Sequence, residues 1–438
     1  MDSEDMGLSD RIRIPFHGLE PRSHRLSWSQ TYMWDFLSRM RPFEGLYNLS
    51  IDLRLPVAIS VEQAVRIIGN LVHSHEALRT SYYADGSRPP RQEVAGVGHL
   101  DVGLVEESCF DSWFDANRNA SFRRDAPPLQ FVVSRRDKSV RRLTLIASHL
   151  AMDGWGIAVI QQEVLRYMSD AASPVRRARQ PVDQATWEAS SAGTSRNRAG
   201  IDYWQKTIEV APAGCFKPLL SLSKSRFCRA EVSSVAAGRA VLALAREHGA
   251  PQAAIVLTAY LRAVTAVFGY SRVVFWVVAH NRFDRELREA VGCFFRDTVV
   301  SLESLPDEPS RAVRLVASSL LRALRYTQTD ARKIDQLLLN ADRGSYFDLI
   351  RGFYYNFTAG SALASGNRKE EQSREIKWSA EKEFDTQVTY LNSDLQGDSL
   401  ILRMLIDTWC VPMDLVEKIL THCLEDLIDG LPARKLLG

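Results

Sequence analysis

Segments with helical periodicity alternate with strand-like segments along most of this chain, and this alternation constrains the fold more than any other feature. Apolar residues recur every three or four positions in stretches such as 235–248 and 252–268. Between such stretches lie short apolar runs rich in β-branched and aromatic residues, for example 272–279. This order of elements is typical of mixed folds, so the sequence predicts an α/β protein. At 438 residues, the chain can form two domains or one large two-lobed body.

Local signals predict several element boundaries. Ser60 followed by Gln63 forms a capping box, which predicts a helix that begins directly after Ser60. The runs 129–135 and 141–147 predict a β-hairpin that turns at 137–139. Residues 1–22 show no such signal, and we expect them to form a loose lead-in.

The most informative local pattern is SHLAMDGWG at residues 148–156, which directly follows the apolar run 143–147. We expect a strand that ends on His149 and holds the imidazole rigidly, as a general base requires. Asp153 can hold the local backbone by charge-assisted hydrogen bonds, and with Gly154 it forms the turn into a helix at 157–168. Taken alone, the pattern is short, and a strand-end histidine beside an Asp-Gly turn is the simpler explanation.

Other parts of the chain favour the functional interpretation, because they follow a known pattern in the same order. Residues 148–156 resemble the HHxxxDG active-site motif of the condensation-domain family of nonribosomal peptide synthetases and related CoA-dependent acyltransferases. Further stretches resemble other elements of that family, and the resemblance runs from about residue 26 to 430. These stretches are 27–34 (SWSQTYMW), 75–80 (HEALRT), 183–187 (DQATW), 291–295 (VGCFF), 347–348 (FD) and 355–357 (YNF).

The resemblance implies two chloramphenicol-acetyltransferase-like lobes arranged in a V, with an inter-lobe tunnel that has His149 at its floor. The N-terminal lobe would span 23–175 and carry the motif. Residues 176–200, rich in Ala, Ser and Arg, would connect it to a C-terminal lobe at 201–438. A polar segment near 360–380 would form a crossover loop between the lobes.

The resemblance also implies roles for individual residues. His149 would be catalytic together with Asp153 and Gly154, and Ser148 and Trp155 would contact the substrate. Arg282 and Arg79 would support the site. Arg282 matches a family arginine that pairs with the motif aspartate, so we expect a structural Asp153–Arg282 ion pair, because a buried carboxylate needs a partner.

Departures from the family pattern narrow the possible reactions. Ser148 replaces the first motif histidine, Tyr32 replaces an arginine of the opening element, and Arg296-Asp297 replaces an Asn-Thr pair. Val278 stands where the epimerisation branch has a catalytic glutamate, and Ser148 where the heterocyclisation branch has an aspartate, so both branches are disfavoured. His280 is more readily explained as a structural histidine than as a second base.

The sequence therefore predicts a free-standing condensation-type acyltransferase. It would form an amide or ester between an acyl or aminoacyl thioester and an amine or hydroxyl, with His149 as the base. We expect no bound cofactor or metal. The substrate would arrive on the phosphopantetheine arm of an acyl or peptidyl carrier protein in trans, or as a CoA thioester, and the acceptor would be a small amine or alcohol or a second carrier protein.

The alternative is a catalytically silent, condensation-like docking module that recruits a tailoring enzyme to a carrier-bound peptide. Ser148 and Arg296-Asp297 keep this alternative open, whereas an intact His149, Asp153 and Gly154 count against it.

Composition excludes several other classes of function. A formal net charge of +2 gives no overall drive toward nucleic acid. There is no apolar run of membrane-spanning length, and the acidic start at 1–5 is no secretory signal, so we expect a cytoplasmic protein. We also expect a monomer. The six cysteines show no metal spacing and are predicted to be buried thiols. Arginine pairs around the His149 strand are either solvated or dock an acidic partner.

Overall fold

A computed structural model of the protein describes residues 8, 10–84, 86, 89–123, 126–170, 178–210, 225–303, 305–340, 352–359, 375–380 and 387–431. These residues divide into two compact units. The first contains the described residues up to Thr194 together with His280–Phe295, and the second contains Ser195–Ala279 and most of the residues from Arg296 onward. Both units combine sheets with helices, so the predicted α/β class is confirmed.

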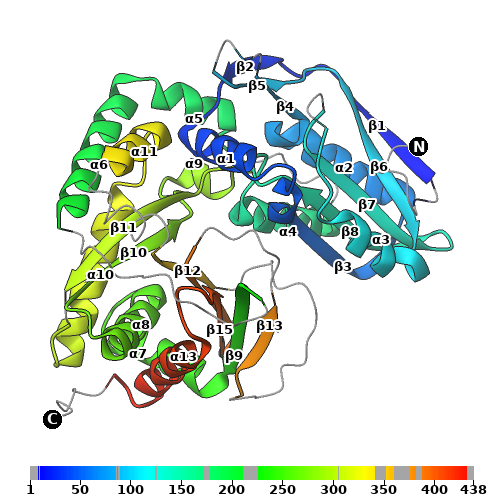
Figure 1. Ribbon diagram of the computed structural model, residues 1–438. Helices are drawn as coiled ribbons and strands as arrows, with labels where there is room; N and C mark the ends of the chain where they lie inside the picture. Colours follow the sequence, from blue (N-terminus) through cyan, green and yellow to red (C-terminus); the bar gives the residue numbers. More distant parts are fainter. Residues whose placement is uncertain are drawn as a thin grey trace. The chain divides into compact units, whose positions relative to one another are not determined.

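The first unit is built on a five-stranded sheet in the order β1-β6-β7-β8-β3 and a small sheet in the order β2-β5-β4 (Figure 1). Neighbours in the larger sheet are antiparallel except for β6 and β7, and β7 and β8 form the predicted hairpin. The strands are β1 (Asp10–Phe16), β2 (Arg22–Arg25), β3 (Leu49–Ser60), β4 (Thr80–Tyr83), β5 (Arg91–Val94), β6 (Gly98–Glu106), β7 (Leu129–Arg136) and β8 (Ser139–Ala147).

Helices of the first unit pack on the larger sheet and flank it. The predicted capping box is present at the start of α2, where the Ser60 hydroxyl accepts from the Gln63 N–H and the Gln63 side chain accepts from the Ser60 N–H. Buried side chains of α2 and α4 form one core cluster with β7 and β8, including Ile68, Phe131 and Ile160. The helices are α1 (Trp28–Arg39), α2 (Val61–Ser74), α3 (Phe110–Asn117), α4 (Gly154–Ser169), α5 (Pro181–Glu188) and α9 (Arg285–Arg288), and α6 (Ser191–Glu209) continues into the second unit.

The second unit is built on a seven-stranded sheet in the order β11-β10-β12-β14-β15-β9-β13. Figure 1 shows α7, α8 and α13 grouped together beside this sheet, and the middle of α8 is almost wholly buried in the core of this unit. The strands are β9 (Phe227–Ser234), β10 (Arg272–Ala279), β11 (Arg296–Glu303), β12 (Phe353–Ala359), β13 (Lys377–Ala380), β14 (Thr389–Gln396) and β15 (Ser399–Asp407). The helices are α7 (Val235–Glu247), α8 (Gln252–Phe268), α10 (Pro309–Arg325), α11 (Ala331–Asn340) and α13 (Met413–Ile428).

The predicted loose lead-in at 1–22 is wrong for the residues that the structure describes. β1 pairs with β6 over its whole length and forms one edge of the five-stranded sheet. The strand alternates buried Ile14 and Phe16 with exposed or half-buried residues. This period-two pattern is short and follows an acidic stretch, so the sequence did not predict a strand there.

Two other boundaries also differ from the expectations. His280–Phe295 was assigned to the C-terminal lobe but belongs to the first unit. The connection predicted at 176–200 is helical from residue 181 and contains α5 and the start of α6. Most of the expected crossover loop near 360–380, and the pair at 347–348, lie outside the described residues. The V arrangement and the tunnel stay predictions.

Three chemical expectations can be compared with the described part of the chain. Cys109 is exposed, which corrects the prediction of buried thiols, whereas Cys228, Cys293, Cys410 and Cys423 are buried. No group of His, Cys, Asp and Glu side chains there could hold a metal ion. Of the helices described, none alone has the length and apolar character to cross a membrane, and only α7 and α8 together, bent by 113°, meet those criteria.

Candidate active site

His149 lies in the turn between β8 and α4. β8 ends at Ala147, two residues earlier than predicted, because the chain then folds back on itself. The Ser148 N–H donates to the Pro128 carbonyl at 2.9 Å, and the Ser148 carbonyl accepts from the Ala151 N–H at 2.9 Å. The imidazole is therefore carried by a hydrogen-bonded turn rather than by the strand itself.

Asp153 caps the N-terminus of α4. Its Oδ1 accepts a hydrogen bond from the Gly156 N–H at 2.9 Å, which satisfies one of the donors that a helix start leaves open. The helix consequently begins at Gly154, three residues before the predicted start. The Asp153 side chain is buried, so its charge requires further partners.

Arg282 supplies the main partner, and the predicted ion pair is present. Its two terminal nitrogens donate to the two carboxylate oxygens of Asp153, each at 2.8 Å. Arg282 is itself only 1% exposed. Its guanidinium also donates to the carbonyls of His280, Ala290 and Gly292. This two-pronged geometry is the strong form of an arginine–carboxylate contact.

The segment 291–295 supplies the remaining hydrogen bonds to Asp153. The sequence did not predict these bonds. The N–H groups of Phe294 and Phe295 donate to Asp153 Oδ2 at 2.8 and 3.0 Å, and the Asp153 N–H donates to the Gly292 carbonyl at 3.1 Å. The segment 291–295 resembles a family element, so the sequence marked it as important. The resemblance placed it in the predicted C-terminal lobe, away from Asp153.

Two glycines permit this close approach of backbones. A Cβ atom on Gly156 would lie 3.3 Å from the backbone nitrogen of Gly292. A Cβ atom on Gly292 would lie 2.6 Å from the ring of Phe294 and 2.8 Å from Pro181. A side chain at position 156 would therefore crowd the Gly292 backbone, and a side chain at position 292 would collide with Phe294 and Pro181.

The environment keeps Asp153 ionised. Burial, the largest influence, would raise the pKa of its carboxyl group. The Arg282 charge and the hydrogen bonds from Arg282, Gly156 and Phe294 outweigh burial and lower the pKa below its ordinary value.

The environment of His149 favours its neutral form. Burial lowers the pKa of the imidazole, and backbone groups of His149 and Met152 and the Asp153 charge only partly oppose this shift. The centroid of its ring lies 4.7 Å from that of Phe295, and the Phe295 and Tyr32 rings form an edge-to-face pair with centroids 6.0 Å apart. A neutral imidazole at neutral pH can accept a proton, as a general base must.

Ser148 lines a cavity of about 80 Å³ in the first unit. The walls include Trp34 and Leu37 of α1 and Tyr82 of β4. Ser148 Oγ accepts from the Leu150 N–H at 3.3 Å. The Ser148 side chain therefore borders open space, and its predicted contact with the substrate stays a prediction.

Trp155, the other predicted substrate contact, lies against the segment 280–288. Its side chain is 41% exposed, its Nε1 donates to the Arg288 carbonyl at 2.8 Å, and its ring lies 4.8 Å from the His280 ring. His280 Nδ1 accepts from the Arg282 N–H at 3.0 Å, which gives His280 the structural bond expected of it. A role of Trp155 in substrate binding stays a prediction.

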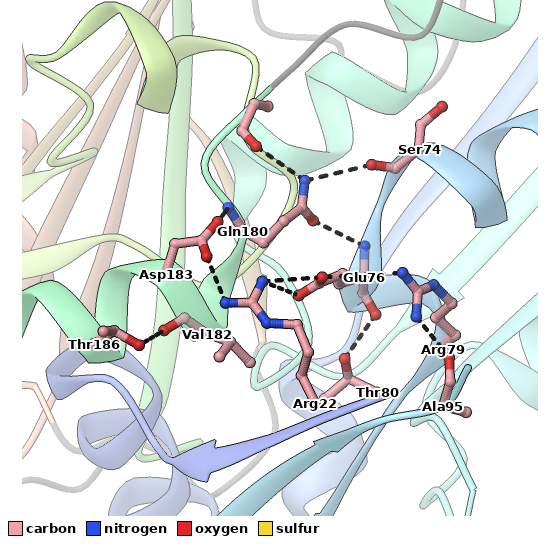
Figure 2. Close-up of polar contacts among 11 residues, drawn as sticks. Arg22, Ser74, Glu76, Arg79, Thr80, Ala95, Gln180, Val182, Asp183 and Thr186 are labelled. Carbon is pink, nitrogen blue, oxygen red and sulfur yellow. Dashed lines mark hydrogen bonds and ion pairs between the residues drawn. The ribbon is translucent and has the colours of Figure 1, made fainter. Parts of the chain in front are cut away.

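Arg79, which the resemblance assigned to the support of the site, makes its contacts in and beside the HEALRT element. One terminal nitrogen donates to the Ala95 carbonyl at 2.6 Å and the other lies 4.0 Å from Glu76, so its contacts fix the HEALRT element rather than the His149 turn. Figure 2 shows the network around it, in which Arg22 bridges Glu76 and Asp183. The stretch DQATW at 183–187 is thereby joined to HEALRT by an ion-pair network.

The opening element SWSQTYMW is tied to the same structure. Ser29 Oγ donates to the Phe294 carbonyl at 2.9 Å, and the Trp28 N–H donates to Glu188 of α5 at 2.7 Å. Every stretch of the first unit that resembles the family, together with 291–295, is therefore linked to its neighbours by buried or half-buried hydrogen bonds.

Several arginines of the predicted docking patch around the His149 strand form ion pairs within the protein. Arg135 pairs with Glu106, and Arg179 pairs with Glu286. Arg142 is buried among carboxylates, which argues against part of the predicted docking patch; Arg124, Arg176 and Arg177 lie outside the described residues. Arg296 and Asp297 are buried at the start of β11 in the second unit.

Comparison with protein families gives a match across most of the chain. A family model described as "Condensation domain" matches residues 22–398. Malpibaldin synthetase of Mortierella alpina is 25% identical over 346 residues, which cover 72% of this chain and 6% of the relative. Phosphinothricin tripeptide synthetase PhsC of Streptomyces viridochromogenes is 26% identical over 301 residues, which cover 63% of this chain and 27% of the relative. The chain thus spans only a small part of these relatives.

Solved structures share the fold. The condensation domain of the monacolin K polyketide synthase MokA superposes with a TM-score of 0.75 at 15% identity and covers 95% of this chain and 99% of its own. The epimerization domain from the third module of tyrocidine synthetase B superposes with a TM-score of 0.72 at 13% identity and covers 95% and 100%. At this identity the likeness establishes the fold alone, which confirms the predicted chloramphenicol-acetyltransferase-like fold.

Replacing the carboxylate at the centre of this site should destabilise the protein. Asp153→Ala leaves the Arg282 guanidinium buried without its counter-charge, and breaking a buried pair costs on the order of 3–5 kcal/mol. We expect a corresponding fall in the free energy of unfolding in urea. Asp115→Ala, at an exposed position of α3, is the matched control and should change little. Equal stabilities of the two variants would refute the structural role of Asp153.

Acid should abolish the contribution of Asp153 in a defined direction. The folded-state pKa of Asp153 lies below the unfolded value of about 3.9. Its stabilisation is therefore fully present above pH ~4 and is lost as the pH falls through the folded-state value. The difference in unfolding free energy between wild type and Asp153→Asn should shrink in this acid range, as measured by urea unfolding at a series of pH values. A difference that stays constant with pH would contradict the lowered pKa.

Proposed function

Because the chain belongs to the condensation-domain family, we propose that it is a condensation-type acyltransferase that joins an acyl or aminoacyl thioester to an amine or hydroxyl acceptor. The single observation that carries this proposal is His149, whose pKa is lowered by burial and whose turn is held by the Asp153–Arg282 pair. The acyl group would arrive on the phosphopantetheine arm of a carrier protein, or on CoA. The acceptor would be a small molecule or a second carrier-bound group.

In the proposed reaction, the acceptor nitrogen or oxygen attacks the thioester carbonyl while His149 Nε2 takes the acceptor's proton. The new C–N or C–O bond forms, the C–S bond breaks, and the thiolate that leaves takes the proton from the imidazolium. The Gly154 N–H stands at the start of α4, where helix donors lack intrahelical partners, and would stabilise the oxyanion. Asp153 would act by positioning, because its carboxylate is occupied by the five hydrogen bonds from Arg282, Gly156, Phe294 and Phe295.

Removing the imidazole should abolish most of the activity without unfolding the protein. Loss of a general base typically lowers the rate about 10²- to 10⁴-fold, so His149→Ala should lose that much turnover. Mass spectrometry of reactions with carrier-bound acyl groups and free amines measures the product. His99→Ala, at an exposed position of β6, is the control and should keep wild-type turnover. Wild-type turnover in a folded His149→Ala protein would exclude this mechanism.

Ser148→His separates the proposed enzyme from the silent docking module. The cavity beside Ser148 can receive part of an imidazole, so the variant should fold. If His149 is the base, turnover should change less than tenfold, or about 1.4 kcal/mol, because the new ring is not needed for proton transfer. Product formation and carrier binding should be measured for both proteins.

Each outcome of that comparison has one meaning. Similar turnover in both proteins supports the acyltransferase. Carrier binding without product from either protein would replace it with the docking module. A large gain of activity in Ser148→His would show that the first motif position takes part in catalysis, and would contradict both functions.

A further inference from the structure

The second unit carries an open groove along the edge of its sheet. β11 is the end strand of the seven-stranded sheet and pairs only with β10 among the described strands. The groove has a volume of about 1140 Å³ and runs along Val300–Glu303 of β11, with walls from α6 and α10. An edge strand presents unpaired N–H and C=O groups that another chain can use.

Helices cover both faces of β11 but leave its edge open. On one face Val299 packs in a cluster with Trp204 of α6 and Trp276 of β10. On the other face Val300 and Leu302 belong to the same core cluster as buried residues of α10. The groove therefore follows the open edge of β11, with α6 on one side of the strand and α10 on the other.

One hydrogen bond indicates which backbone groups face the groove. The Tyr203 hydroxyl of α6 donates to the Val299 carbonyl at 2.6 Å. Backbone groups of alternate residues in a strand point to the same side, so Ser301 and Glu303 present their N–H and C=O groups to the groove as well. Tyr203 stacks on Tyr326 at 5.0 Å, and both side chains line the groove. The Ser301 hydroxyl is buried and has no hydrogen-bond partner in the described part of the chain.

The walls carry unpaired positive charge and exposed apolar groups. Lys206, Arg322 and Arg325 line the groove, are exposed, and form no ion pair within the described residues, whereas Arg272 is paired with Glu303. Only Asp202 offers an unpaired negative charge among the described residues that line the groove. Exposed apolar side chains line the same groove: Val210, Leu315 and Leu321.

We propose that this groove docks an extended acidic peptide segment of a partner protein, which adds as a strand to the free edge of β11. Backbone hydrogen bonds to Ser301 and Glu303 would hold the segment, as in other cases of strand addition. The cations of both helices would select acidic side chains, and the exposed apolar residues would receive alternate apolar ones. This site is separate from His149 and does not depend on the proposed reaction.

Fluorescence anisotropy with a labelled peptide of alternating Glu and Val tests the proposal. Wild type should bind it saturably at low salt and more weakly at high salt. The double variant Arg322→Glu/Arg325→Glu should weaken binding about tenfold or more. Arg311→Glu, an exposed reversal on the same helix outside the groove, should leave binding unchanged.

A second pair of variants separates strand addition from attraction by charge alone. Ser301→Pro removes the N–H that faces the groove and should abolish binding, whereas Ser301→Ala keeps that N–H and should bind normally. Far-UV circular dichroism and the melting temperature check each fold. If Ser301→Pro does not fold, an N-methylated form of the peptide tests the same bonds with the wild-type protein, and it should not bind.

Three results would overturn the proposal. One is absence of binding by the wild-type protein. Another is binding that survives both Ser301→Pro and N-methylation of the peptide. The third is competition by single-stranded poly(dT) as effective as competition by the unlabelled peptide, which would assign the groove to polyanions in general.

Discussion

The arrangement of the first unit depends on one buried carboxylate. Asp153 accepts hydrogen bonds from a guanidinium and from three backbone N–H groups, and these donors come from three separate stretches of chain. A buried pair repays its desolvation only when the geometry is good and the remaining hydrogen-bonding capacity is filled, and both conditions hold here. The turn that carries His149 is thereby held on its C-terminal side by the contacts of Asp153. On its N-terminal side it is held by β8, which ends at Ala147.

The stretches that resemble the family serve mainly as a framework. HEALRT joins DQATW through Arg22, and SWSQTYMW joins VGCFF through Ser29. His75 lies 2.7 Å from Glu163 of α4, which links HEALRT to the helix that comes after the active-site turn. The His75 imidazole is thus engaged with a carboxylate, whereas the pKa of the His149 imidazole in the turn is lowered by burial. One departure has a structural counterpart: Tyr32, which stands where the family pattern has an arginine, packs against the Phe295 ring that lies beside His149.

The sequence was sufficient where local signals agreed with the fold. The capping box at Ser60, the β7–β8 hairpin and the boundaries of α8 followed from patterns within a few residues. The Asp153–Arg282 pair also followed, but from the resemblance rather than from spacing. Contacts that join distant segments could not be derived, because periodicity reports which face is buried and not its partner. Two such contacts are the packing of 280–295 in the first unit and the hydrogen bond from Arg79 to the Ala95 carbonyl.

The place of residues 280–295 in the chain has a consequence for protein engineering. This excursion leaves the second unit at the end of β10 and returns at the start of β11, two strands that pair directly through Ala279 and Arg296. A fragment cut near residue 194 would lack Arg282 and would retain Asp153 as a buried, uncompensated charge. Exchange of a contiguous N-terminal segment between homologues would likewise separate Asp153 from Arg282 of the same chain. The two units therefore cannot be exchanged as two contiguous pieces of sequence. Junctions in a chimaeric protein should keep residues 280–295 together with the turn that contains His149 and Asp153.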